Sequence, residues 1–166
     1  VTLIRGKSGH PYNMMFGLDP TFDAVLYVGY HAAAGCPEFA VSHTSTGNSL
    51  YITLNGKRMS EFMLNSFTAA SLGVPVAFIP DEAICAAAKE LVPEIAAVQT
   101  KRGVGNATFC CPPETVMEAL REQTKEALGK IGRCHVELPE KFVYEVTYKD
   151  WKKAYQMSFF PGMKAV

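Results

Sequence analysis

Two histidines and one glutamate, His31, His43 and Glu61, are the residues whose types and spacing could support catalysis. Each histidine follows a short apolar run, at 24–28 and 39–41, with the length and the β-branched or aromatic content of a buried strand. In α/β folds, residues just past the ends of buried strands often carry ligand-binding and catalytic groups. Neutral imidazoles and a carboxylate suit zinc or a similar ion, and a histidine that is not a ligand could transfer protons or stabilise an oxyanion.

Other interpretations of these residues stay open from spacing alone. The three side chains could be unrelated polar groups on loops, since no HExxH-type motif is present. Cys36, in the glycine-containing loop between the histidines, could be a nucleophile with His31 or His43 as its base, giving a metal-poor or cysteine-assisted amidase. Cys36 could equally be a small packing residue. A third alternative is a non-catalytic subunit of an oligomeric shell.

The segment that leads to Glu61 predicts a strand, a turn and a helix. Residues 50–54 form an apolar run that closes at an Asn-Gly turn. A helical pattern then covers 57–72, with Ser60 as a candidate cap and a glycine after its last residue. Asn65 follows Glu61 by four residues, so both lie on one side of this helix. Asn65 is therefore a candidate substrate-binding or supporting amide, or part of a solvated face.

The rest of the chain alternates between strand and helix patterns, which predicts an α/β fold. We expect a layered mixed sheet flanked by helices, with a C-terminal β-hairpin and helix, in a single domain over 1–166. Further strands are expected at 1–4, 74–79, 95–98, 134–138 and 142–148, and further helices at 82–91, 112–129 and 150–160. The strands 134–138 and 142–148 are expected to pair around Pro139. Trp151, Ala154 and Tyr155 are expected to pack the last helix against the body.

Composition excludes several classes of protein. Sixteen basic residues balance sixteen acidic ones among 166, so net charge indicates neither nucleic acid nor a membrane surface as a partner. No apolar run approaches the roughly 18–20 residues of a membrane span, and the first residues do not resemble a signal peptide. Five irregularly spaced cysteines make a poor disulfide framework and favour reduced thiols in a cytoplasmic protein.

Several short motifs, in order, resemble those of the D-aminopeptidase family. They are GYHA at 29–32, SHT at 42–44, the run from Tyr51 through Asn55-Gly56 to Ser60-Glu61 and Asn65, GVPV at 73–76, KELVP at 89–93, YKD at 148–150 and Ala154-Tyr155. Each motif is only moderately specific, and their order and spacing carry the resemblance. The family consists of self-compartmentalising zinc peptidases that act on short peptides of D-amino acids. The chain matches only its C-terminal two-thirds.

The resemblance implies a metal-dependent hydrolase that cleaves an amide bond in a short peptide or small amide. By position, His31 and Glu61 would be metal ligands and His43 the catalytic residue, in a pocket that holds two zinc ions in the complete site. A basic loop predicted at 100–106 corresponds to a lysine-containing loop near the family's active site. Lys101 is therefore a candidate substrate contact, although it could equally be an exposed loop lysine. The resemblance also implies an oligomer.

One departure from the family pattern concerns the metal ligands. The family's remaining ligands, an aspartate-x-glutamate on a first strand and a histidine on a later loop, precede the matched part, and this chain has neither. Two protein ligands hold zinc weakly, because catalytic sites normally use three. The chain also begins at Val1 without a methionine. The missing part could be a bound companion chain, could have been removed, or could be absent from a divergent protein without metals. We expect the C-terminal part of a longer or cleaved precursor, completed by an N-terminal companion chain.

Overall fold

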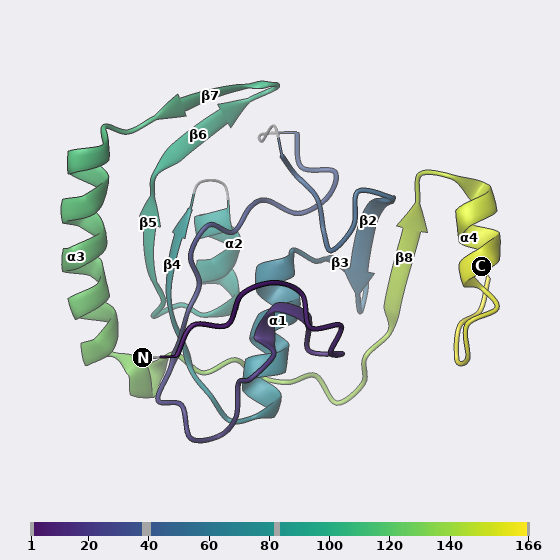
Figure 1. The fold of residues 1–166 in the computed structure, drawn as a ribbon, viewed down its shortest axis with the longest axis horizontal. Helices are drawn as coiled ribbons and strands as arrows, with labels where there is room; N and C mark the ends of the chain where they lie inside the picture. The colour runs from purple at the N-terminus through teal and green to yellow at the C-terminus, as the bar shows by residue number, and fades with distance from the viewer. Residues whose placement is uncertain (1, 38–40, 82–83, 166) are drawn as a thin grey trace.

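The computed structural model describes residues 2–37, 41–81 and 84–165. These residues form a mixed α/β fold of sheets flanked by helices, which confirms the predicted class (Figure 1). In chain order the elements are η1 Asn13–Met15, β1 Val25–Leu26, β2 Ser49–Leu54, β3 Lys57–Arg58, α1 Glu61–Ser71, β4 Val76–Asp81, α2 Ile84–Leu91, β5 Ala96–Gln99, β6 Lys101–Val104, β7 Ala107–Cys110, α3 Pro113–Gly129, η2 Ile131–Arg133, β8 Tyr144–Tyr148 and α4 Trp151–Met157.

A parallel sheet in the order β1-β4-β5 forms the centre of the molecule. Figure 1 shows α3 on one side of this sheet and α1 and α2 on the other. Apolar runs form its strands because both faces are covered, and the side chains of Val76 and Ile79 are fully buried. The main core joins these strands to Phe62 of α1, to Ala88 of α2 and to Val92, which directly follows α2. The carboxyl ends of the strands are therefore held on a rigid base.

A second, antiparallel sheet has the order β3-β2-β8 and packs on the other side of α1. Its buried residues Ile52, Leu54 and Met59 contact Met63 and Phe67 of that helix. The expected turn at Asn55 and Gly56 joins β2 to β3, with both residues at positive φ. Helix α1 therefore lies between two sheets, which explains why its apolar residues do not fall on a single stripe.

The beginning of α1 agrees with the predicted cap at Ser60, whereas Lys57–Arg58, the first residues of the predicted helical pattern, form strand β3. The Ser60 hydroxyl accepts a hydrogen bond from the backbone N–H of Met63 at 3.2 Å, which is the standard bond of an N-cap serine. Glu61 is the first residue of the helix, and the helix ends before Gly73, whose φ of +74° suits a glycine. The cap fixes the backbone of Glu61 relative to the rest of the chain.

Two predicted strands are wrong. Residues 2–4 form no strand, and Leu3 is 78% exposed. Residues 134–138 are extended and bury Cys134 and Val136 alternately with exposed neighbours, but they join no sheet. One backbone bond, from the Val76 N–H to the Cys134 carbonyl, ties this segment to the start of β4. The partner of β8 is therefore β2 and not 134–138, so the C-terminal strand and helix are present without the expected hairpin.

Two other expectations are corrected near the surface. The predicted loop at 100–106 contains strand β6, which pairs with β7 as a two-stranded ribbon. Gly105, at φ +57°, is the first of two turn residues, as in hairpin turns that need glycine there. Helix α4 begins after Asp150, whose carboxylate caps it, but Trp151 and Tyr155 are 74% and 63% exposed and do not pack against the body.

Some predicted boundaries fall outside the described residues. Phe39 and Ala40 of the predicted strand 39–41 are among these, and Val41 lies in a turn. The predicted start of the helix at 82–91 also lies outside, and α2 is described from Ile84. Of the described helices, none combines the length and apolar character required to span a bilayer.

Candidate metal centre

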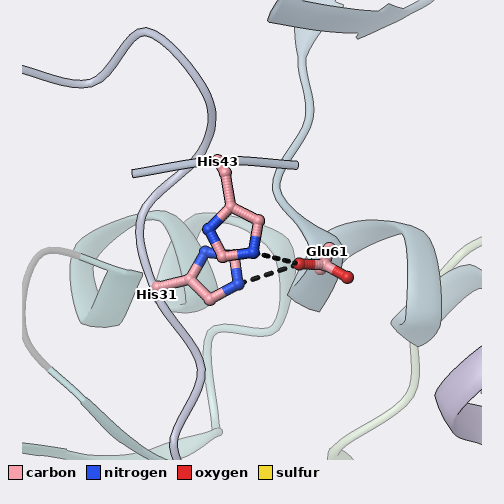
Figure 2. Close-up of side chains that lie close together, drawn as sticks. All are labelled: His31, His43 and Glu61. Atoms are coloured by element: carbon pink, nitrogen blue, oxygen red, sulfur yellow. Dashed lines mark ion pairs between the residues drawn. The ribbon is translucent and has the colours of Figure 1, made fainter. Parts of the chain in front are cut away.

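His31, His43 and Glu61 converge on one point (Figure 2). The Nε2 atom of His31 lies 2.8 Å from Oε2 of Glu61, and the Nε2 atom of His43 lies 3.5 Å from the same oxygen. The two imidazole rings are stacked, with centroids 3.7 Å apart and planes inclined by 17°. One candidate ligand atom from each residue lies within 4.8 Å of the others. The structure therefore brings together three side chains that the sequence places 12 and 18 residues apart.

Each of the three side chains enters from a different element. His31 follows β1 after a turn at Gly29, whose φ of +75° favours glycine. His43 belongs to a loop before β2, and Glu61 opens α1. A carboxylate in the first turn of a helix is stabilised by the positive end of the helix dipole. The site is therefore built where the central sheet, the loop and α1 meet.

Thr44, next to His43, fastens this loop to two other segments. Its side chain is fully buried. Its Oγ1 atom accepts a hydrogen bond from the Ala34 N–H and donates one to the Met59 carbonyl, both at 3.0 Å. Ala34 belongs to the segment after His31, and Met59 lies two residues before Glu61. One hydroxyl group thus fixes the spacing of the three backbone segments that carry the site.

We expect Thr44→Val to destabilise the protein by about 2–4 kcal/mol, because valine keeps the shape but leaves a buried N–H and a buried carbonyl without a partner. Chemical denaturation of the metal-free protein measures this difference. Thr46→Val is the matched control, since the Thr46 hydroxyl accepts a single exposed hydrogen bond from Asn48. An equally small effect of both substitutions would contradict the role assigned to Thr44.

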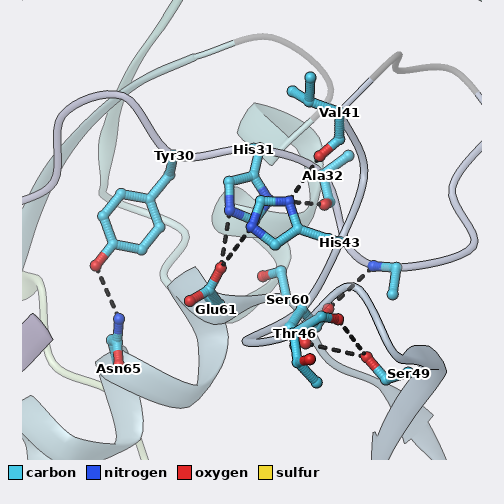
Figure 3. Close-up of polar contacts among 12 residues, drawn as sticks. Tyr30, His31, Ala32, Val41, His43, Thr46, Ser49, Ser60, Glu61 and Asn65 are labelled. Carbon is cyan, nitrogen blue, oxygen red and sulfur yellow. Dashed lines mark hydrogen bonds and ion pairs between the residues drawn. The ribbon is translucent and has the colours of Figure 1, made fainter. Parts of the chain in front are cut away.

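The tautomer of each histidine follows from its second ring nitrogen. Nδ1 of His31 lies 3.1 Å from the Ala32 carbonyl, and Nδ1 of His43 lies 2.8 Å from the Val41 carbonyl (Figure 3). A carbonyl oxygen only accepts hydrogen bonds, so each Nδ1 carries a proton. In the neutral ring, Nε2 then presents a lone pair. Both lone pairs point at the Glu61 carboxylate, as in histidines oriented for metal binding by a backbone carbonyl.

The Glu61 carboxylate is ionised at neutral pH. Burial alone would raise its pKa. When the two imidazoles are protonated, the hydrogen bond from His31 and the charges of His31 and His43, together with the Ser45 backbone N–H, outweigh burial and lower the pKa. Its side chain is only 9% exposed. A buried carboxylate of this kind requires positive charge beside it.

The donor set fits a divalent cation. Without a cation, two arrangements of the histidines are possible, and both are unfavourable. If both rings are protonated on both nitrogens so that they donate to Glu61, two positive charges are stacked on each other. If both rings are neutral, their Nε2 lone pairs face a negatively charged carboxylate. A cation at the shared point removes both problems. Ligand atoms on a tetrahedral zinc with ~2.0–2.1 Å bonds lie about 3.3 Å apart. The His43–Glu61 separation of 3.5 Å is close to this value, and the His31–Glu61 separation of 2.8 Å is shorter.

A pocket of about 320 Å³ opens over the three side chains. It is lined by Lys7, Asn13, Met14, Val28, Gly29, Tyr30, His31, His43, Ser45 and Glu61. Sequence reasoning missed the contribution of Lys7, Asn13 and Met14, because glycines and a proline made 5–16 look like an irregular loop without a role. No motif in that segment marks it as part of a site.

Asn65 does not line this pocket but holds a residue that does. Its Nδ2 atom donates a hydrogen bond to the Tyr30 hydroxyl oxygen at 2.8 Å (Figure 3). Burial and the nearby Glu61 charge raise the pKa of Tyr30 to about 12, although the bond from Asn65 acts in the other direction. Tyr30 therefore stays protonated at neutral pH. Because Asn65 already donates to its oxygen, the Tyr30 hydroxyl proton is available to another acceptor.

The remaining candidates lie elsewhere. Lys101, at the start of β6, and Cys36 are not among the residues that line the pocket. Among the described residues, the cluster that could hold a metal ion consists of His31, His43 and Glu61, without Cys36. His10 accepts a hydrogen bond from the Tyr12 N–H at Nδ1 and packs on Phe16. The predicted substrate contact by Lys101 stays a prediction.

Comparison with known proteins identifies the family. The sequence model of the D-aminopeptidase peptidase family matches residues 1–166. The chain belongs to the D-aminopeptidase family. The resemblance inferred from its motifs is thereby confirmed.

A curated sequence and a solved structure, both from Bacillus subtilis, support the assignment to the D-aminopeptidase family. A curated protein named D-aminopeptidase, from strain 168, is 28% identical over 155 residues, which are 92% of this chain and 56% of that protein. A solved structure, described as the Zn-dependent D-aminopeptidase DppA, a self-compartmentalizing protease, superposes with a TM-score of 0.88 at 27% identity. The alignment covers 98% of this chain and 60% of that structure. The chain thus spans less than two-thirds of the length of the relatives it matches.

Proposed function

We propose that this chain is the metal-binding part of a hydrolase that cleaves an amide bond in a short peptide or small amide. The observation that carries this proposal is the convergence of two imidazole lone pairs and one ionised carboxylate at a single point beneath a pocket. The names of the matched sequence and structure, D-aminopeptidase and Zn-dependent D-aminopeptidase, favour zinc as the cation and a peptide as the substrate.

In this proposal His31 and Glu61 are metal ligands. Their side chains are the most enclosed of the three, at 15% and 9% exposure, and the Ala32 carbonyl fixes the orientation of the His31 ring. Zinc bound there would polarise the scissile carbonyl and lower the pKa of a bound water. The negative charge of Glu61 would also partly neutralise the positive charge of the bound zinc ion.

His43 is proposed as the catalytic residue. Its side chain is 43% exposed, so it faces the open part of the pocket while its Nε2 atom stays next to the metal-binding point. The Val41 carbonyl holds the proton on Nδ1 and leaves Nε2 free to accept a proton from a water or a substrate. After accepting one, Nε2 can donate it to the leaving amine. Asn65 supports Tyr30, whose hydroxyl can bind a substrate oxygen.

The site is incomplete for tight zinc binding. Two or three protein ligands leave positions open, and a second zinc ion would require further acidic groups. We propose that residues outside this chain supply them, either on a longer form of the protein or on a companion chain. We further propose an oligomer, because the solved relative is a self-compartmentalizing protease. Free cysteines at 36, 85, 110, 111 and 134 favour a reducing compartment such as the cytoplasm.

Native mass spectrometry of the purified protein, combined with metal removal, tests the proposal. We expect the intact assembly to contain zinc and more than one subunit. Treatment with a chelator should remove the zinc and abolish cleavage of a dipeptide of D-alanine, and added zinc should restore both. The same spectrum shows any companion polypeptide directly. Cleavage that persists after complete loss of zinc would contradict the proposed function.

A further inference from the structure

The N-terminal segment forms one wall of the pocket above His31, His43 and Glu61. Three of its residues, Lys7, Asn13 and Met14, line the pocket. Met15, the last residue of η1, is buried in the main core, which also contains Phe62 of α1. The wall is therefore fixed to the helix that carries Glu61.

This wall presents polar groups that the protein itself leaves unused. Among the residues described as lining the pocket, Lys7 is the one that carries a permanent positive charge. Within the described part of the chain, no ion pair or hydrogen bond engages its ammonium group. The same holds for hydrogen bonds of the Asn13 side-chain amide. Asn13 adopts a φ of +50°, which asparagine tolerates better than most residues, so η1 can begin there.

We infer that Lys7 binds the terminal carboxylate of the substrate, with the Asn13 amide as a second donor. This inference rests on the proposed function and makes it more specific: the substrate is a short peptide with a free carboxyl end. The volume of about 320 Å³ lies at the lower end of ligand pockets, which span ~300–1,000 Å³. A pocket of this size holds a short peptide and not a long one. The carboxyl end of a bound short peptide therefore lies close to the amide bond that is cleaved.

Charge favours the same assignment. The lining of the pocket includes both Lys7 and the centre formed by His31, His43 and Glu61, which acts on the amide bond in the proposed mechanism. The far end of a dipeptide is a carboxylate, and a cationic donor is its strongest partner. Lys7 is exposed, so binding requires little desolvation of its ammonium group.

Steady-state kinetics of the zinc-loaded full protein test this inference with two probes. They are a dipeptide of D-alanine and the same dipeptide with a C-terminal carboxamide. Lys7→Met should raise KM for the free acid about tenfold or more, because a charge-assisted bond is lost. It should leave KM for the carboxamide within about twofold, and kcat nearly unchanged. Lys7→Arg, which keeps the charge, should retain most of the preference for the acid.

Lys57→Met is the matched control, since Lys57 is an exposed lysine of β3 that does not line the pocket. Zinc content and circular dichroism establish that each variant is folded and loaded. Equal effects of Lys7→Met on the acid and the carboxamide, or no effect on either, would overturn the inference while the zinc-dependent activity stands. If the wild-type protein cleaves neither probe, the proposed function fails. The contribution of Lys7 to binding is then measured by calorimetric titration, which compares the affinity for the free acid with that for the carboxamide.

Discussion

Replacement of Glu61 by glutamine should lower the zinc affinity of the protein by at least about a hundredfold. Glutamine keeps the size of the side chain but removes the charge that faces the two imidazoles. Loss of a residue that merely supports a ligand weakens metal sites by about 10–100-fold, and loss of a charged ligand should exceed this range. Competition with a chelating dye of known affinity measures the change, and metal analysis after dialysis gives the zinc content.

Glu114→Gln is a close control for this substitution. Glu114 is also a glutamate in the first turn of a helix, α3, but it is exposed and lies outside the pocket lining. Both variants lose the same helix-dipole interaction, so a difference between them reports the metal site. Zinc affinity that stays at the wild-type value in Glu61→Gln would exclude this carboxylate as a ligand.

The convergence of the site residues could be predicted from the sequence because it depends on local signals. The apolar run that becomes β1 ends near His31, and the Ser60 cap places Glu61 at the start of α1. Strand ends and helix starts meet at the same edge of α/β sheets. These two rules favour the site, but spacing alone left other interpretations open, and the resemblance to the D-aminopeptidase family shifted the balance toward it. Residues 39 and 40, in the predicted strand before His43, lie outside the described residues.

The pairing of strands could not be predicted from the same kind of signal. Cys134 and Val136 alternate with exposed residues as in a strand. Such alternation shows which face of the segment is buried, but it does not show whether the backbone is hydrogen-bonded to a neighbouring strand. β2 and β8 lie about 90 residues apart in the sequence. They pair because side chains of both strands pack in one apolar cluster with residues of α1. Glycines at 103 and 105 indicated a loop, whereas one of them forms the hairpin turn between β6 and β7.

The wall formed by Lys7 and Asn13 also lay beyond sequence reasoning. A glycine- and proline-containing segment has no periodicity, so nothing local shows what it covers. Its position depends on Met15, which reaches the core between distant elements. Tyr30 was missed for a related reason. Its role depends on Asn65, 35 residues away, which the sequence identified as a candidate without showing its partner.

Replacement of His43 by alanine should lower kcat by about 10²–10⁴-fold while zinc remains bound. Proton transfer by a positioned histidine contributes an acceleration of about this size. The proposed ligands His31 and Glu61 are untouched by the substitution, so metal content should stay near that of the wild type. The change should appear in kcat more than in KM, because proton transfer takes place in the transition state. Steady-state kinetics and metal analysis on the same sample measure both quantities.

The same variant separates two roles that the geometry leaves close together. Nε2 of His43 lies 3.5 Å from Glu61, near enough to share a metal ion with it. If His43 were a ligand, His43→Ala would lose zinc in parallel with activity, and excess zinc would restore part of the rate. If His43 transfers protons, excess zinc restores nothing. His10→Ala is the control, because His10 contacts Tyr12 and Phe16 of its own segment and is not among the pocket-lining residues. It should match the wild type in both zinc content and rate.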